Sequence, residues 1–251
     1  MLDAFLTDLL TQTRALALTY WRQGFAVDTK PDRTLVTEAD RAIEALIRDR
    51  VKAAFPSDGL FGEEYGGEAL EAERVWVIDP IDGTQAFVMG VPVFSTLIAV
   101  LQQGEVTHAA ADFPALDLSA RAVKGQGAYM NEERLRVSQD VALEAATLTA
   151  TSTTMFSGDD AHRFQKLVAA TGSVRFGLDA FGFCTLARGR ADLVVEACLK
   201  PYDFMAPGLI VAEAGGLMTD WRGNPLGLSS EGKVIAAGSA QLHASALGIL
   251  A

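Results

Sequence analysis

The chain has 251 residues, of which 49% are hydrophobic and 21% charged, a composition that suits one large globular domain or two closely packed lobes. Its formal net charge of −11 argues against binding to nucleic acid or to an anionic membrane surface. Two cysteines outside any CxxC pair, no apolar run of about 18 residues and no secretory signal at the N-terminus indicate a cytoplasmic protein without disulfides, a cysteine-type zinc site or a membrane span.

The first half of the chain is predicted to place two helices on a largely antiparallel sheet. Apolar residues at helical spacing predict helices over residues 3–24 and 37–55, and Thr37 is placed to cap the second one. Glycines predict a loop around residues 62–66. Apolar runs then predict strands at 75–78, 93–102, 105–113 and 118–123.

The second half alternates strands and helices, as layered α/β folds do. Strands are expected at 146–151, 173–176, 192–196, 216–220 and 233–237. Helices are expected at 159–171, 179–188, 203–214 and 239–249. The best internal boundary lies near residues 138–144, so we expect an N-terminal α+β lobe at 1–140 and a C-terminal α/β lobe at 141–251, packed as one unit.

The most informative segment is Asp79-Pro80-Ile81-Asp82-Gly83-Thr84, which follows the apolar run 75–78. Two carboxylates three residues apart suit a hard divalent cation such as Mg²⁺, and the Ile81 carbonyl between them could add a third oxygen. A helix that begins at Thr84 would direct its free N–H groups at an anion, and Gly83 would let the backbone approach closely. The same residue types also favour a simple turn.

Other carboxylates have both a functional and a purely structural interpretation. Glu63 and Glu64 repel each other unless a positive group lies between them, although Glu64 also fits a solvated surface position. Asp40, in the first turn of a predicted helix, complements the helix dipole. Asp203 opens a later helix as its expected N-cap, and an N-cap aspartate can also coordinate a metal ion.

These motifs together resemble those of the inositol monophosphatase superfamily. The resemblance runs from Lys30 to about Gly223, and Tyr202 departs from it where many members have Trp. It is carried, in the family's order and spacing, by Val36-Thr37-Glu38-Ala39-Asp40, Glu63-Glu64, Asp79-Pro80-Ile81-Asp82-Gly83-Thr84, and Asp203 with Glu213-Ala214-Gly215-Gly216. It implies a Mg²⁺-dependent phosphomonoesterase of the α/β (α+β) class, with an αβαβα layered sandwich.

The resemblance also implies roles for individual residues. Two or three Mg²⁺ ions are expected to be bound by Glu63, Asp79, Asp82, Asp203 and the carbonyl of Ile81. Asp40 and Thr84 are expected to orient the water that attacks phosphorus, and Glu63 is expected to join them in catalysis. Phosphate and substrate contacts are expected from Gly83, Thr84 and Asp203. Because a bound metal ion generates the nucleophile from water, the reaction needs no Ser, Cys or His nucleophile.

The substrate is expected to be a cationic phosphate ester. Asp179 and Glu196 lie in segments that resemble the leaving-group pocket of the family, and two carboxylates in one pocket favour a cationic alcohol. Asp179 could instead only cap the helix that follows it. The segments 94–99 and 196–203 are similar to the histidinol-phosphatase branch, which implies hydrolysis of L-histidinol phosphate to L-histidinol in histidine biosynthesis. Gln85 departs from that branch, where a Lys is expected.

Other functions stay open at this point. Inositol 1-phosphate is the alternative substrate, whereas the adenosine bisphosphate branch is disfavoured because no basic cluster suits a second phosphate. Two alternatives are not enzymes: a family member that binds a macromolecular partner without catalysis, and an acidic protein that binds Mg²⁺ or Ca²⁺. Phosphate release would distinguish an enzyme from both. The family resemblance also implies a homodimer, and both faces of the predicted strand 93–102 are apolar enough to be covered.

Overall fold

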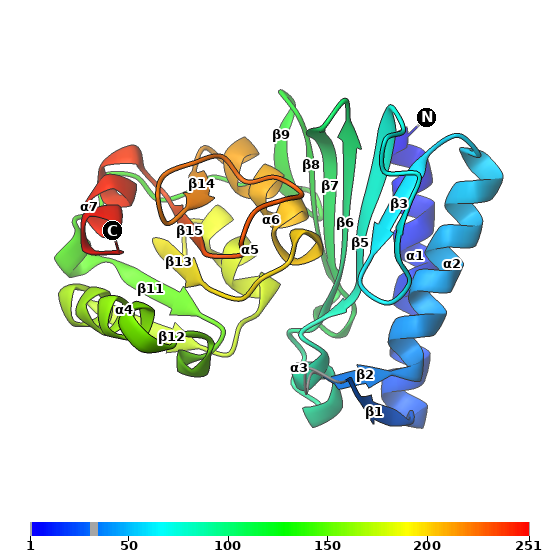
Figure 1. Ribbon diagram of the computed structural model, residues 1–251, viewed down its shortest axis with the longest axis horizontal. Helices are drawn as coiled ribbons and strands as arrows, with labels where there is room; N and C mark the ends of the chain where they lie inside the picture. Colours follow the sequence, from blue (N-terminus) through cyan, green and yellow to red (C-terminus); the bar gives the residue numbers. More distant parts are fainter. Residues whose placement is uncertain (1, 31–34, 251) are drawn as a thin grey trace.

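A computed structural model describes residues 2–30 and 35–250. Within these residues the chain is arranged in five layers, in the order helices, sheet, helices, sheet, helices (Figure 1). The predicted αβαβα sandwich is therefore confirmed.

The helices are α1 (Leu2–Gln23), α2 (Glu38–Ala54), α3 (Thr84–Met89), α4 (Gly158–Ala170), α5 (Ala180–Ala187), α6 (Pro201–Glu213) and α7 (Ala240–Leu250). The strands are β1 (Val27–Thr29), β2 (Leu35–Thr37), β3 (Gly59–Gly62), β4 (Gly66–Glu68), β5 (Arg74–Asp82), β6 (Ser95–Gln102), β7 (Glu105–Phe113), β8 (Leu118–Val123), β9 (Gly127–Met130), β10 (Glu133–Arg134), β11 (Thr147–Ala150), β12 (Ser173–Phe176), β13 (Leu193–Glu196), β14 (Leu217–Asp220) and β15 (Val234–Ala237). Each predicted helix and strand has a counterpart among them. The strands without a predicted counterpart are β1, β2, β3, β4, β9 and β10. The loop predicted around residues 62–66 is the turn of a β3–β4 hairpin.

The first sheet has the strand order β10-β9-β8-β7-β6-β5-β3-β4. Its pairs are antiparallel, except that β3 runs parallel to β5. All residues of β6 except the last are buried, because helices cover both faces of the sheet. The two-sided burial predicted for residues 93–102 is thus confirmed.

Helices α1 and α2 form the outer layer on one face of this sheet (Figure 1). Leu9 of α1 and Ile43 and Ile47 of α2 are buried against Trp76 and other side chains of β5. Helix α2 begins where its sequence predicts, because the side chain of Thr37 accepts hydrogen bonds from the first backbone N–H groups of the helix.

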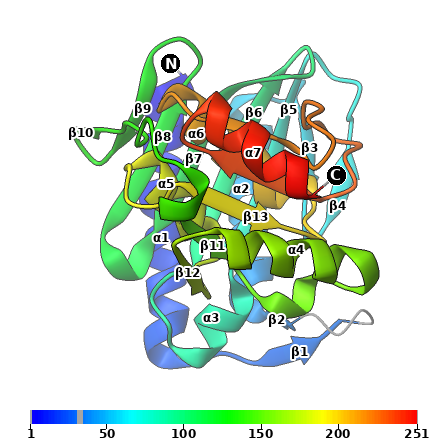
Figure 2. The same cartoon turned by 90° about the vertical axis from the view of Figure 1, so that its left-hand side faces the viewer.

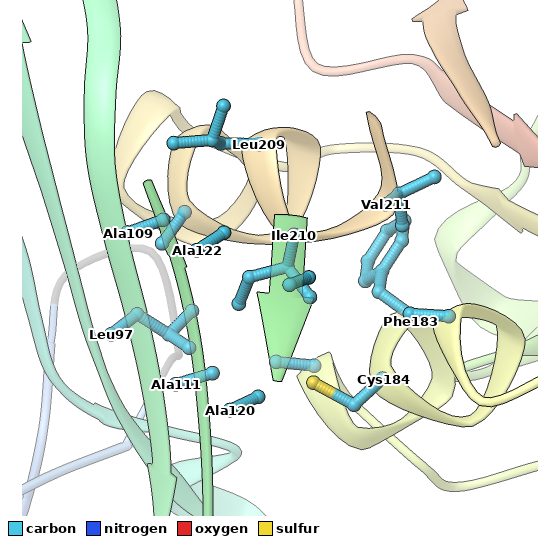
Figure 3. Close-up of a cluster of buried hydrophobic side chains, with 14 of the residues drawn as sticks. Leu97, Ala109, Ala111, Ala120, Ala122, Phe183, Cys184, Leu209, Ile210 and Val211 are labelled. Atoms are coloured by element: carbon cyan, nitrogen blue, oxygen red, sulfur yellow. The ribbon is translucent and has the colours of Figure 1, made fainter. Parts of the chain in front are cut away.

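Helices α5 and α6 fill the layer between the two sheets. Figure 3 shows Ile210 of α6 and Cys184 of α5 facing the alanine-rich surface of β7 and β8. Small side chains such as Ala111 and Ala120 let the helices approach the sheet closely. Full burial of an aliphatic side chain such as Ile210 stabilises a fold by about 1.5–3 kcal/mol.

The second sheet has the strand order β12-β11-β13-β15-β14. Strand β11 is parallel to both β12 and β13, whereas β15 is antiparallel to its neighbours. Helices α4 and α7 cover its outer face, in front of the sheet in Figure 2. The parallel arrangement matters for the site, because β11 and β13 end side by side.

Candidate active site

A pocket of about 590 Å³ opens between the end of β5, the N-termini of α3, α5 and α6, and the ends of β11 and β13. The residues singled out from the sequence that line it are Glu63, Asp79, Ile81, Asp82, Gly83, Thr84, Asp179, Glu196 and Asp203. Asp40 does not line the pocket; it is fully buried beneath Thr84. The tertiary structure thus brings together carboxylates that lie more than 100 residues apart in the sequence.

The end of β5 places Asp79 and Asp82 in the pocket wall. The pairing register with β6 shifts between these two residues, next to Pro80, which has no N–H to donate to a sheet. Asp79 is only 2% exposed, and its Oδ1 has no hydrogen-bond partner among the described residues. The Oδ2 of Asp82 accepts hydrogen bonds from Ser95 Oγ at 3.2 Å and from the backbone N–H of Ala180 at 2.9 Å.

Burial and like charges raise the pKa values of these acids. Burial is the main reason why the pKa of Asp79 lies well above its ordinary range, and the carboxylate of Glu63 adds repulsion. Burial has the same effect on the pKa of Asp82, to which Asp179 adds its charge. Carboxylates this close together are stable as anions only when a positive charge is bound among them.

The turn between β3 and β4 presents Glu63 and Glu64, and Lys30 lies between them. The Nζ of Lys30 is 2.8 Å from Glu63 Oε1 and 2.7 Å from Glu64 Oε1, so a positive group does separate the two carboxylates. The Glu64 side chain is only 6% exposed, and its predicted surface position is wrong. The carboxylate of Glu44 on α2 accepts the backbone N–H of Glu64 at 2.7 Å and holds the turn in place.

Asp40 and Thr84 lie side by side at the base of the pocket. One oxygen of Asp40 accepts hydrogen bonds from the backbone N–H and the hydroxyl of Thr37, at 2.7 and 2.6 Å. The other oxygen is 3.4 Å from the hydroxyl of Thr84, which is also 3.0 Å from the carbonyl of Ile81. Burial raises the pKa of Asp40 to about 6.

Gly83 and Thr84 form the start of α3, as the sequence predicts. Gly83 is the N-cap in the left-handed region, at φ 74°, which glycine adopts without strain. The first N–H groups of a helix have no intrahelical acceptor, so those at the start of α3 are free for a ligand in the pocket.

Asp203 belongs to the first turn of α6 but is not its N-cap. The N-cap is Lys200, and Asp203 at the third helical position accepts the Lys200 backbone N–H at 2.6 Å. The expectation of an N-cap aspartate is therefore wrong by three residues, because the helix already starts at Pro201. Burial raises the pKa of Asp203 to about 7, with Glu63 adding to the rise.

Asp179 and Glu196 face the same pocket from the other side. Asp179 occupies the N-cap position of α5, yet its side chain makes no capping hydrogen bond within the described chain, so the purely capping interpretation is wrong. Its backbone has φ 48° and ψ −141°, which is rare for a residue with a side chain. Glu196 is 2% exposed at the end of β13. Burial raises the pKa of Asp179 to about 6 and that of Glu196 to about 8.

The comparison with known protein families agrees with this geometry. Residues 2–250 match the model described as "Inositol monophosphatase family". This chain belongs to the inositol monophosphatase family.

Members of this family with high similarity include phosphatases of two kinds. A histidinol-phosphatase from Chlorobaculum parvum is 38% identical over 231 residues, covering 91% of this chain and 89% of the relative. A histidinol-phosphatase from Mycobacterium tuberculosis is 36% identical over 230 residues, covering 88% of each chain. The solved structure of an inositol monophosphatase from Zymomonas mobilis superposes with a TM-score of 0.89 at 35% identity, over 98% of this chain and 96% of that one. The protein is accordingly a phosphatase, a phosphoric monoester hydrolase.

Inositol monophosphatase family enzymes depend on metal ions, and the residues of this pocket fit a divalent cation. The buried Oδ1 of Asp79, without a hydrogen-bond partner among the described residues, has the position and chemistry of a hard-metal ligand. Within residues 2–30 and 35–250, no three His, Cys, Asp or Glu side chains converge into a ready-made cage. Mg²⁺ does not require one, because it binds through one or two carboxylates together with waters and substrate phosphates.

Three residues that support the site were given no role from the sequence. Ser95 and the backbone of Ala180 hold Asp82, and Thr151 holds Glu196. Only the position of Thr151 at the end of the predicted strand 146–151 could have pointed to it. His108, His162 and His243 do not line this pocket. None of the helices in the described ranges combines the length and apolar character needed to cross a membrane.

Proposed function

We propose that this phosphatase hydrolyses L-histidinol phosphate to L-histidinol and inorganic phosphate, with Mg²⁺ as its metal. The observation that carries the proposal is the pair of buried carboxylates, Asp179 and Glu196, opposite the acidic residues at the end of β5 in the same pocket. Histidinol carries an ammonium group and an imidazole, so it supplies the positive charge that such a pair needs. The histidinol-phosphatase name of two relatives with 36–38% identity supports the same substrate.

Glu63, Asp79, Asp82, Asp203 and the Ile81 carbonyl would hold the metal ions. Their oxygens suit Mg²⁺, and two or three ions would compensate the charge that burial concentrates here. Bound Mg²⁺ supplies Lewis-acid stabilisation of the phosphoryl oxygens and lowers the pKa of a coordinated water. Lys30 would share Glu63 with such an ion, since its Nζ contacts only one oxygen of that carboxylate in the described structure.

The remaining groups position the reactants. Thr84 and Asp40 form a donor–acceptor pair at the pocket base, which would orient the attacking water, and Glu63 would join them. The free N–H groups of Gly83 and Thr84 would receive phosphate oxygens at the start of α3. Phosphoryl transfer depends mainly on such positioning and on electrostatic stabilisation.

Inositol 1-phosphate is the second candidate substrate. The structural similarity to the Zymomonas mobilis inositol monophosphatase favours it, and a carboxylate such as Glu196 can also accept hydrogen bonds from hydroxyl groups. A neutral polyol, however, would leave the charge of Asp179 without a partner.

The decisive test is phosphate release from a panel of substrates with Mg²⁺. We expect the highest kcat/KM on histidinol phosphate among histidinol phosphate, inositol 1-phosphate, adenosine 3′,5′-bisphosphate and fructose 1,6-bisphosphate. An equal or higher kcat/KM on inositol 1-phosphate would overturn the substrate and leave the reaction class unchanged. No release from any of the four would favour a family member that acts by binding a partner.

Asp82→Asn tests the metal assignment. The amide keeps the shape and removes one ligand charge, so we expect kcat to fall by about two orders of magnitude or more while the circular dichroism spectrum stays unchanged. Asp49→Asn on the exposed face of α2 is the matched control and should retain full activity. Near-normal turnover of folded Asp82→Asn would contradict the role of Asp82.

A further inference from the structure

The two carboxylate oxygens of Glu196 have different surroundings. Oε1 accepts the backbone N–H of Thr151 at 2.8 Å and the Thr151 hydroxyl at 3.0 Å. Oε2 is buried and has no hydrogen-bond partner among the described residues. Burying a carboxylate oxygen without a hydrogen-bond donor costs free energy, so there should be a reason why Oε2 is held in this position.

The sheet brings Thr151 to Glu196. Strands β11 and β13 run parallel, with Leu148 opposite Leu193 and Thr149 opposite Val194. The same register carried two residues further sets Thr151, the first residue after β11, opposite Glu196, the last residue of β13. Both residues line the pocket.

Two donors on one oxygen fix the orientation of the whole carboxylate group. The terminal torsion of a glutamate has a broad energy minimum and rotates easily when the group is free. Because both hydrogen bonds converge on Oε1, that rotation is stopped and Oε2 keeps one direction.

The geometry points to Thr151 as a positioning residue for substrate selection: it holds Glu196 so that Oε2 receives an N–H of a cationic alcohol group. This inference rests on the proposed histidinol phosphate activity, and it adds the reason why Oε2 is left without a partner within the protein. Asp179 lines the same pocket and raises the negative charge at this end of it.

Thr151 also favours the charged form of the carboxylate. Burial raises the pKa of Glu196 to about 8, and the two hydrogen bonds from Thr151 act in the opposite direction. Without the hydroxyl, a smaller fraction of Glu196 would be ionised at neutral pH and the contact with a substrate cation would weaken.

The test compares Thr151→Val with the wild type on two substrates at saturating Mg²⁺. Valine keeps the shape and the backbone N–H but removes the hydroxyl. We expect KM for histidinol phosphate to rise about tenfold with kcat within twofold, and KM for glycerol 2-phosphate, which has no cation, to stay unchanged. Thr151→Ser, which restores a hydroxyl, should return KM for histidinol phosphate to within about threefold of the wild type.

Thr149→Val is the matched control. Thr149 lies two residues earlier, on β11, and is 2% exposed, whereas Thr151 is half-buried. Its hydroxyl has no partner in the described chain, so its loss should leave both KM values unchanged. Thr151→Ala serves the same comparison if the valine variant does not fold, as checked by thermal melting.

The possible results distinguish the role of Thr151 from the proposed histidinol phosphate activity. A wild type without preference for histidinol phosphate would overturn the proposed function and the cationic ligand with it. A wild type that has this preference, together with a Thr151→Val variant that keeps it or that loses both substrates equally, would overturn only the role of Thr151.

Discussion

At the scale of single residues, Asp179 combines an unfavourable backbone with an unfavourable charge. Its φ of 48° with ψ of −141° belongs to a region that residues with side chains rarely adopt, and such strain costs about 1–3 kcal/mol. Burial raises the pKa of its carboxyl group to about 6, and its negative charge adds to the rise that burial causes in the pKa of Asp82. Backbone strain and a buried charge both cost free energy at Asp179, and a bound ligand that compensates for this cost best explains why the residue is there.

Asp179→Gly should therefore stabilise the metal-free protein and impair substrate binding. Glycine relieves the backbone strain and removes the buried charge, so we expect the free energy of unfolding to rise by about 1–2 kcal/mol in urea titrations with EDTA. KM for histidinol phosphate should rise about tenfold or more. Asp179→Ala keeps the strained backbone and is the control; a glycine variant less stable than the alanine variant would refute the strain argument.

At the scale of elements, the β3–β4 hairpin and α2 form one unit through Gly62 and Glu44. A Cβ atom on Gly62 would lie 1.9 Å from Glu44 Oε1, so only glycine leaves room for that carboxylate. Glu44 is fully buried, and it accepts N–H groups of the turn and the guanidinium of Arg48. The position of Glu63 in the pocket thus depends on a residue in another element.

Gly62→Ala should disrupt this unit. The added methyl group must displace Glu44, which leaves buried polar groups without partners, and we expect the free energy of unfolding to fall by about 2–4 kcal/mol. Mg²⁺ binding, followed by calorimetry, should weaken as Glu63 moves. Gly227→Ala, where a Cβ meets no atom within 4 Å, is the control and should change neither quantity. Equal stability of the two variants would contradict the packing argument.

At the scale of the whole molecule, a chain with a net charge of −11 gathers buried carboxylates in one pocket. Asp40, Asp203 and Glu196 have pKa values of about 6, 7 and 8 in the folded protein, because burial disfavours their charged forms. In the unfolded chain such groups titrate near about pH 4. Between about pH 4 and 8 the folded protein therefore binds more protons than the unfolded chain.

The stability of the metal-free protein should fall as pH rises through this window. By linkage, the free energy of unfolding decreases with pH wherever the folded state holds more protons. Added Mg²⁺ should raise the melting temperature more at pH 8 than at pH 5, because its ligands must be deprotonated. Melting curves at pH 5, 6, 7 and 8, with EDTA or Mg²⁺, test this. Metal-free protein that becomes more stable from pH 5 to 8 would show that the pocket acids are ionised without a cation.

Short-range sequence patterns were enough to predict the long helices and strands and the contiguous part of the site. Hydrophobic periodicity predicted the long helices and strands, and local capping predicted the start of α2 at Thr37. Asp79, Ile81, Asp82, Gly83 and Thr84 could be recognised together because the chain holds them within six residues. These features depend on interactions between residues close in sequence, and short-range patterns report such interactions directly.

The distant residues that complete the site could be identified only from the folded chain. Ser95 and Ala180 meet Asp82, Lys30 meets Glu64, and Thr151 meets Glu196 through hydrogen bonds that span 13 to 98 residues. A contact of this kind also explains why the surface position predicted for Glu64 is wrong. Glutamate is usually a surface residue, but the Glu64 side chain is buried against Lys30. Strand order and helix packing bring these partners together, and no local periodicity encodes them, because the free energy that selects each pair comes from burial in the assembled layers.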